Sequence, residues 1–161
     1  MPLLTERGIG IGVAAVILGL GGAGQVLGRL GYGPLHRRLD VRSRTLAVLL
    51  GVAVSTGLIA ILTGLAGLVA AVIFAGVVRG LLTLVQATAV RERWGAAHYG
   101  RLTGVLLAPA TMTAALAPWI GAALAASLGG YAAMFWVMGA VALTAAITSV
   151  WSVPSAAAIR S

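Results

Sequence analysis

Three polar side chains recur along a strongly apolar stretch in the middle of the chain. Arg79, Thr83 and Gln86 follow one another at spacings of four and three residues, and Gly76 precedes Arg79 by three. On a helix these spacings place all four residues on one face. Such a small and polar stripe is expected to line a cavity or a polar seam between helices. Gln25, in an earlier apolar stretch, is a further candidate for that cavity or for an interhelical hydrogen bond.

The sequence predicts no catalytic site, no metal site and no cofactor. It contains no cysteine, no HExxH motif and no phosphate-binding loop. Ser55 has no histidine at a comparable depth, because His36 and His98 both fall in arginine-rich segments, where we expect solvated loop residues. We therefore expect a protein that is not an enzyme.

The elements that position these side chains are expected to be membrane-spanning helices. Hydrophobic residues make up 60% of the 161 residues and charged residues 9%, and the mean hydropathy is +1.06. Uncharged runs cover residues 8–28, 45–78 and 102–159. Because a spanning helix needs about 20 apolar residues, the first run accommodates one span and each of the others accommodates two.

Two glycine-containing breaks divide the longer runs. Turns are expected near residues 63–67 and 127–131, since glycine tolerates the dihedral angles of turns. Residues 1–161 are thus predicted to form a single transmembrane domain of an all-α membrane protein. The five predicted transmembrane helices cover residues 8–30, 45–62, 65–90, 102–126 and 131–151.

The net charge of +8 is explained by membrane topology. The predicted loop after the first helix, the loop after the third helix and the C-terminal tail share one side of the membrane. They hold Arg29, Arg37, Arg38, Arg42, Arg44, Arg91, Arg93, Arg101 and Arg160. Only Arg7 lies on the other side. The positive-inside rule therefore predicts an external N-terminus and a cytoplasmic C-terminus in a multi-pass protein of the plasma (inner) membrane. The lipid bilayer, and no nucleic acid, is the expected partner.

Arg79 is the exception to this distribution. It precedes Arg91 by 12 residues, about 18 Å of helix, and so is expected near the middle of the membrane. Such a charge costs on the order of 3 kcal/mol on insertion scales. The acidic residues, Glu6, Asp40 and Glu92, are all predicted at or beyond helix ends. Three readings follow: a structural arginine satisfied by carbonyls and water, a residue of a transport cavity, or a side chain that snorkels to the surface.

Glycine and proline mark two further helices. Gly24 and Gly28 form a GxxxG step, which permits close approach either to another helix of the same bundle or to a second copy of the chain. Pro109 and Pro118 interrupt the fourth predicted helix, and Gly121 follows them. Prolines of this kind either bend a helix permanently or mark a helix that moves during alternating access.

The arginine-rich segments resemble the loops of the major facilitator superfamily. In "GYGPLHRRLDVRSR" the start matches that family's Gly-x-Leu, and the basic run follows. The matching positions are Gly33, Leu35, Arg37, Arg38, Asp40, Arg42 and Arg44. The acidic residue that the family carries two positions after the leucine is Arg37 here, and Asp40 falls later. "RERWGAAHYGRLTG" resembles a second loop of the family, and "APWIG" resembles its Pro-x-x-Gly.

The resemblance implies five helices of a six-helix half-bundle, similar to helices eight to twelve of a twelve-helix transporter. The chain would then be a fragment of a secondary active transporter that moves a small solute by alternating access, with efflux as the expected direction. It would be inactive without the missing N-terminal half. Arg79 falls where the family often carries a membrane arginine. The alternative is a small stand-alone membrane interaction protein that oligomerises through its glycine-rich first helix.

Cysteine labelling tests the predicted orientation, because the chain has no native cysteine. Gly64→Cys and Gly130→Cys should react with an impermeant reagent added from outside. Ser43→Cys and Gly95→Cys should be protected until the membrane is opened. The reverse pattern would contradict the predicted topology.

Overall fold

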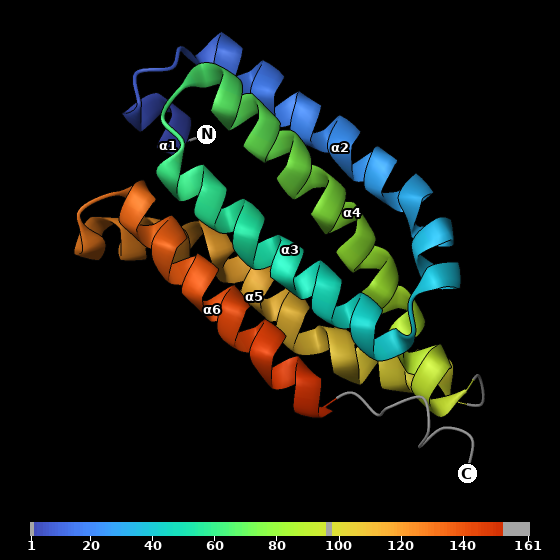
Figure 1. Cartoon of the computed structure of the whole chain (residues 1–161). Coiled ribbons are helices and arrows are strands. Elements are labelled where there is room, and N and C mark those ends of the chain that lie inside the picture. Colours follow the sequence, from blue (N-terminus) through green and yellow to red (C-terminus); the bar gives the residue numbers. More distant parts are fainter. Residues whose placement is uncertain (1, 96–97, 153–161) are drawn as a thin grey trace.

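The computed structural model describes residues 2–95 and 98–152, and all of its regular structure there is helical (Figure 1). A short helix precedes five long ones. Their bounds are α1 Pro2–Glu6, α2 Ile11–Arg38, α3 Val41–Ile61, α4 Leu65–Trp94, α5 Tyr99–Leu128 and α6 Tyr131–Ser152. The five long helices are each long and apolar enough to cross a membrane. The prediction of an all-α membrane protein with five spanning helices is confirmed.

The first spanning helix is longer than the sequence predicted. Residues 8–30 were expected to form it, but α2 begins at Ile11 and continues to Arg38, with Pro34 inside it. The segment after residue 30 was predicted to be a loop because the uncharged run ends at residue 28 and arginines follow it. The connection to α3 is reduced to Leu39 and Asp40. Most of the expected basic loop is therefore helical.

Glycines end two of the later helices. Gly95 follows α4 with a φ of 72°, and Gly129 follows α5 in the left-handed region with a φ of 81°. The backbone N–H of Gly130 donates to the carbonyl of Ala125 at 2.8 Å, which satisfies one of the last carbonyls of α5. The break between α3 and α4 lies at residues 62–64. The break between α3 and α4 and the break between α5 and α6 therefore overlap the regions in which the glycines predicted turns.

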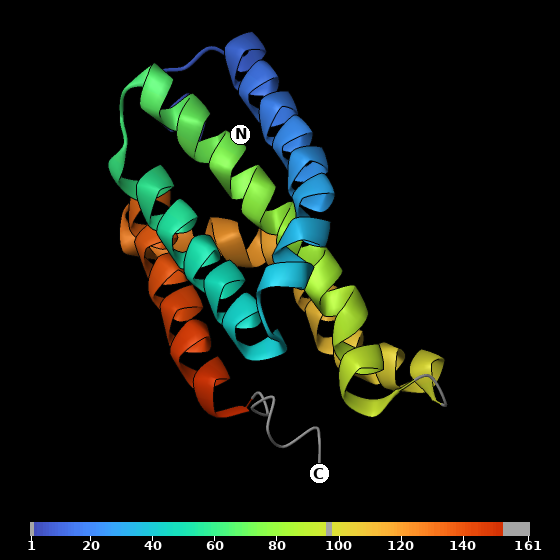
Figure 2. The same ribbon diagram turned by 45° about the vertical axis from the view of Figure 1, so that its right-hand side comes forward.

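The helices form an arc in which α4 lies between α2 and α3, and α6 lies on the far side of α3 (Figures 1 and 2). The helix α5 lies behind this arc and makes few contacts, with α6 and α4. Ala125 is its one fully buried residue among those that the structure describes. Much of α5 is thus available to other molecules or to lipid.

The helices α2 and α4 touch through their backbones. A Cβ atom added to Gly24 would lie 2.5 Å from the carbonyl oxygen of Ile73, closer than real Cβ atoms approach. Gly28 meets the backbone of Val77 more tightly still. From the other side, Gly76 and Gly80 pack against the backbone of residues 21–25. Only glycine permits this separation, and the GxxxG step is thus used inside the bundle.

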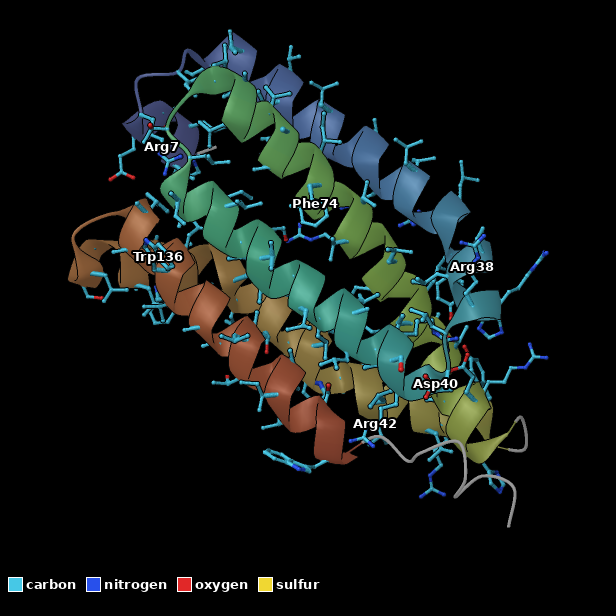
Figure 3. All side chains as sticks on the ribbon, viewed as in Figure 1. Arg7, Arg38, Asp40, Arg42, Phe74 and Trp136 are labelled. Carbon is cyan, nitrogen blue, oxygen red and sulfur yellow. The ribbon has the colours of Figure 1, made fainter. Side chains whose placement is uncertain are left out.

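At one end of the bundle the short helix α1 links two spanning helices. Arg7, which follows α1, donates to the carbonyls of Ala60 (2.8 Å) and Leu62 at the end of α3. Glu6 accepts from the backbone N–H of Tyr131 at 3.1 Å, where α6 begins. Each charge complements the dipole of the helix end that it meets. We call this the Arg7 end; Arg38, Asp40 and Arg42 lie at the other, arginine-rich end (Figure 3).

The backbone contact predicts that single methyl groups will destabilise the bundle. Gly28→Ala and Gly80→Ala should each lower the free energy of unfolding by at least about 1–3 kcal/mol, because the helices must move apart. Gly22→Ala is the matched control on the same helix. Nothing lies within 4 Å of the added Cβ there, so this variant should be neutral or slightly more stable. Equal effects on thermal unfolding in detergent would contradict the proposed role of the contact.

Candidate functional site

The predicted polar stripe of α4 divides between two surroundings. Gly76 is buried under α2 and does not belong to an open face. Arg79 and Gln86 are exposed, and Thr83 between them is half-buried, with its hydroxyl donating to the carbonyl of Gly80 at 2.7 Å. We call Arg79, Thr83 and Gln86 the open face of α4.

The open face lies between the two sides of α4 that are already packed. Gly76 and Gly80 face α2, whereas Val78 and Val85 lie in an apolar cluster with Val48 of α3. Arg79 follows Val78 directly and so points between these contacts. The chain thus keeps a cation at mid-helix on a surface that its own helices leave uncovered.

Arg79 has no hydrogen-bond or ion-pair partner among residues 2–95 and 98–152. The expected internal partners, carbonyls of a broken helix, are therefore not engaged. The acidic side chains Glu6 and Glu92 are bound elsewhere, to Tyr131 and Arg44. Whatever compensates the guanidinium must come from outside the described part of the chain.

Gln25 lies at the same level of the bundle as Arg79. Its backbone oxygen and Cα are the nearest atoms to a Cβ built on Gly80, and its backbone nitrogen lies near one built on Gly76. Arg79 stands between those two glycines in the sequence. The Gln25 side chain is half-buried. The structure therefore brings two of the predicted cavity residues, from α2 and α4, to one depth.

The predicted kink residues lie on α5. Pro109 and Pro118 are both inside this helix and exposed. The hydroxyl of Thr113 donates to the carbonyl of Pro109 at 2.8 Å, as is common near proline in membrane helices. Gly121 faces α6, where the sulfur of Met134 lies 3.7 Å from a Cβ built on the glycine. These residues stay candidates for a moving helix.

The strongest polar contact was not predicted and lies at the arginine-rich end. Arg44, only 1% exposed, points its Nη2 at both carboxylate oxygens of Glu92, at 2.7 and 2.6 Å. Its Nη1 donates to Nδ1 of His36 at 2.6 Å, so that nitrogen acts as the acceptor. One buried guanidinium thus connects the ends of α2, α3 and α4.

The aromatic ring of Tyr32 packs against the Arg44 guanidinium. The carbon centre of the Arg44 guanidinium lies 5.4 Å from the centroid of the Tyr32 ring, within cation–π range. The same ring stacks on His36 at 5.8 Å, and its hydroxyl pairs with the hydroxyl of Thr88 at 2.8 Å. We call Tyr32, His36, Arg44, Thr88 and Glu92 the Arg44 cluster.

The Arg44 cluster stabilises the bundle only while both charges are present. A buried ion pair repays the desolvation of its two charges when its geometry is good and its remaining polar atoms are bonded. Here Glu92 is bonded through both oxygens and is 17% exposed, whereas Nε of Arg44 has no partner among the described residues. Removal of either charge leaves the other one buried and uncompensated. The cluster therefore acts as a latch between three helix ends.

The motif residues of the first loop have different surroundings. Gly33, Arg37 and Arg38 are exposed on the last turns of α2. Leu35 packs against the apolar cluster of Val48. Arg44 alone is buried, while Arg42 is half-buried.

Asp40 caps the start of α3. Its carboxylate accepts from the backbone N–H of Ser43 at 3.4 Å, and hydrogen bonding from Ser43 lowers the pKa of this carboxyl. The cap thus becomes weaker as the pH falls through that lowered pKa. Asp40 makes a local contact and is not part of the ion pair at this end.

His36 is exposed, as expected, but it lies on a helix and not in a loop. It bonds Arg44, because α2 continues past Pro34 and brings the ring to the end of α3. His98 is exposed directly before α5. One signal in the sequence pointed to the ion pair: Glu92 is the only acidic residue in the second basic segment.

The comparison with protein families agrees with this architecture of spanning helices. A family model described as Major Facilitator Superfamily matches residues 1–159. The chain belongs to the major facilitator superfamily. Searches of curated proteins and of solved structures found no match. Members of this superfamily are transporters, so the chain is a multi-pass membrane protein with a transport-type function.

The latch predicts a large loss of stability when its acidic partner is removed. Glu92→Ala should lower the free energy of unfolding by roughly 3–5 kcal/mol, because Arg44 stays buried without a counter-charge. Arg44→Lys should lose less, since the ammonium keeps the charge but not the two-pronged contact. Arg38→Ala, which removes an exposed arginine at the same end, should change stability little. Thermal unfolding in detergent measures all three, and a harmless Glu92→Ala would contradict the latch.

Proposed function

We propose that this chain forms one half of a secondary active transporter that moves a small solute across the plasma membrane by alternating access. The observation that carries the proposal is the open face of α4. It presents the unpartnered Arg79 together with Thr83 and Gln86. A cation at membrane depth is expensive unless it faces water, a solute or another protein segment. Transport provides such surroundings.

The missing N-terminal half is the proposed partner of the surface formed by α4 and α5. Two features support it. The open face of α4 is polar at mid-helix, and α5 is almost without buried residues in the described chain. A second helical bundle placed there would cover the open face of α4 and the part of α5 turned toward it, and would enclose a solute path. Arg79, Thr83, Gln86 and Gln25 would line this path.

The Arg44 cluster would close the cytoplasmic end of this half in the proposed cycle. Alternating access requires contacts that hold one end of the transporter shut while the other end opens. The latch joins the ends of α2, α3 and α4 through groups that are satisfied only together. Pro109, Pro118 and Gly121 lie on the weakly packed α5, the spanning helix with the fewest contacts to resist a movement.

The alternative, a stand-alone protein that oligomerises through its first helix, has lost its main support. Gly24 and Gly28 are covered by α4, so they do not form a free surface for a second copy. The internal use of the GxxxG step favours the transporter reading.

A substitution at Arg79 tests the proposed cavity. Arg79→Leu should leave the thermal stability of this chain unchanged or raise it, because the guanidinium has no partner to lose within the part of the chain that the structure describes. The same change should abolish solute uptake when the chain is co-expressed with the N-terminal half. Arg29→Leu, an exposed arginine near the end of α2, is the matched control for removal of a charge and should leave both properties unchanged.

Two results would contradict the cavity. A loss of about 1–3 kcal/mol in the isolated chain would mean that its own carbonyls satisfy Arg79. Uptake by the five-helix chain alone would mean that no second half is needed.

A further inference from the structure

A hollow beside the first turns of α5 combines a basic end with an apolar wall. It has a volume of about 450 Å³ and is lined by His98, Arg101, Leu102, Val105 and Leu106. Along the helix, His98 is followed three and four positions later by Arg101 and Leu102, and these are followed at the same spacings by Val105 and Leu106. The five residues therefore form one stripe of the helix. The two polar residues come first and the three apolar residues follow. The stripe therefore changes from basic to apolar along the helix axis.

The basic end of this stripe has no counter-charge in the described chain. Arg101 is exposed and has no hydrogen-bond or ion-pair partner among residues 2–95 and 98–152. The sequence has no aspartate or glutamate after Glu92, and Glu92 itself is bound to Arg44. His98 also gives no side-chain cap to α5, so the first N–H groups of the helix reinforce the positive potential there.

The apolar end is exposed to the surroundings of the bundle. Val105 is 70% exposed and Leu106 is 42% exposed, on a helix long and apolar enough to span a membrane. Since α5 begins at Tyr99, we expect the basic residues to lie at the membrane boundary and the apolar ones in the hydrocarbon. A soluble anion would contact only the first part of the stripe. An amphipathic anion would contact both parts.

We propose that this stripe binds one anionic phospholipid. Its phosphate would accept hydrogen bonds from the Arg101 guanidinium, which suits phosphate oxygens well, and would lie beside His98. One acyl chain would follow Leu102, Val105 and Leu106. Basic pockets beside spanning helices are a recurring form of lipid recognition. The site does not depend on the proposed transport cycle, because none of its residues is among those proposed to line the solute path.

Lipid retention by the whole 161-residue chain tests the proposal. The chain would be released from vesicles made of equal parts phosphatidylglycerol and phosphatidylcholine, and bound lipid would be counted by native mass spectrometry. We expect retention of one phosphatidylglycerol in preference to phosphatidylcholine. Arg101→Gln should reduce that retention about fivefold, the effect of one basic residue near an anionic surface. Arg101→Lys should restore most of it and shows that the site is intact.

Matched variants separate this site from general attraction to a basic protein. Arg38→Gln removes the same charge from an exposed position at the end of α2 and should leave retention unchanged. Val105→Ser should weaken phosphatidylglycerol binding through the apolar wall while all charges stay. The proposal is overturned by equal retention of both lipids, by equal loss in Arg38→Gln and Arg101→Gln, or by displacement of the lipid with millimolar inorganic phosphate, which would indicate a soluble-anion site.

Discussion

The direct backbone contact between α2 and α4 is the constraint on which the other features depend. Lipid tails give no hydrophobic drive for helices to associate, so close packing must hold them together. Gly24 and Gly28 on one helix, with Gly76 and Gly80 on the other, permit that packing along several turns. The two helices run side by side as a consequence (Figure 2). Their ends therefore meet at the arginine-rich end, where Tyr32 reaches Thr88.

The charges of the chain are treated in three different ways. Arg7 donates hydrogen bonds to carbonyls at the end of a helix, and Arg44 pairs with the carboxylate of Glu92 while its guanidinium lies over the Tyr32 ring. Arg79 is left open among the described residues. Because the arginines Arg7 and Arg44 at the two ends of the bundle are bonded internally, the mid-helix Arg79 differs from both. It marks the surface at which this half is expected to meet water, solute or a second bundle.

The sequence alone predicted the spanning helices well, because each is an apolar run bounded by charge or glycine. The breaks near Gly64 and Gly129 followed from the same pattern. The extension of α2 past Pro34 was missed, because the arginines after residue 28 indicated a loop. In the structure Tyr32 and Leu35 of this extension pack against the apolar cluster of Val48 and Val78. The inside–outside orientation stays a prediction.

The candidate site was predicted only in part. The spacing of Arg79, Thr83 and Gln86 correctly indicated one shared face, but the same spacing assigned Gly76 to it, which α2 covers. The latch between Arg44 and Glu92 could not be found by periodicity, because its members are 48 residues apart and on different helices. Which of five arginines in the first basic segment becomes buried depends on the three-dimensional meeting of α2, α3 and α4.

The contacts of Glu6 and Arg7 bear on the order in which the chain is assembled. Glu6 is bonded to a residue 125 positions later in the chain, and Arg7 to residues 53 and 55 positions later. Synthesis proceeds from the N-terminus, so α1 must wait for α3 and then for α6 before its two charges are matched. Residues 2–7 are made before the five spanning helices of this chain, yet they are thus among the last of its described residues to be fixed in place. The contact of Glu6 with Tyr131 can form only after α6, the final helix, has been inserted.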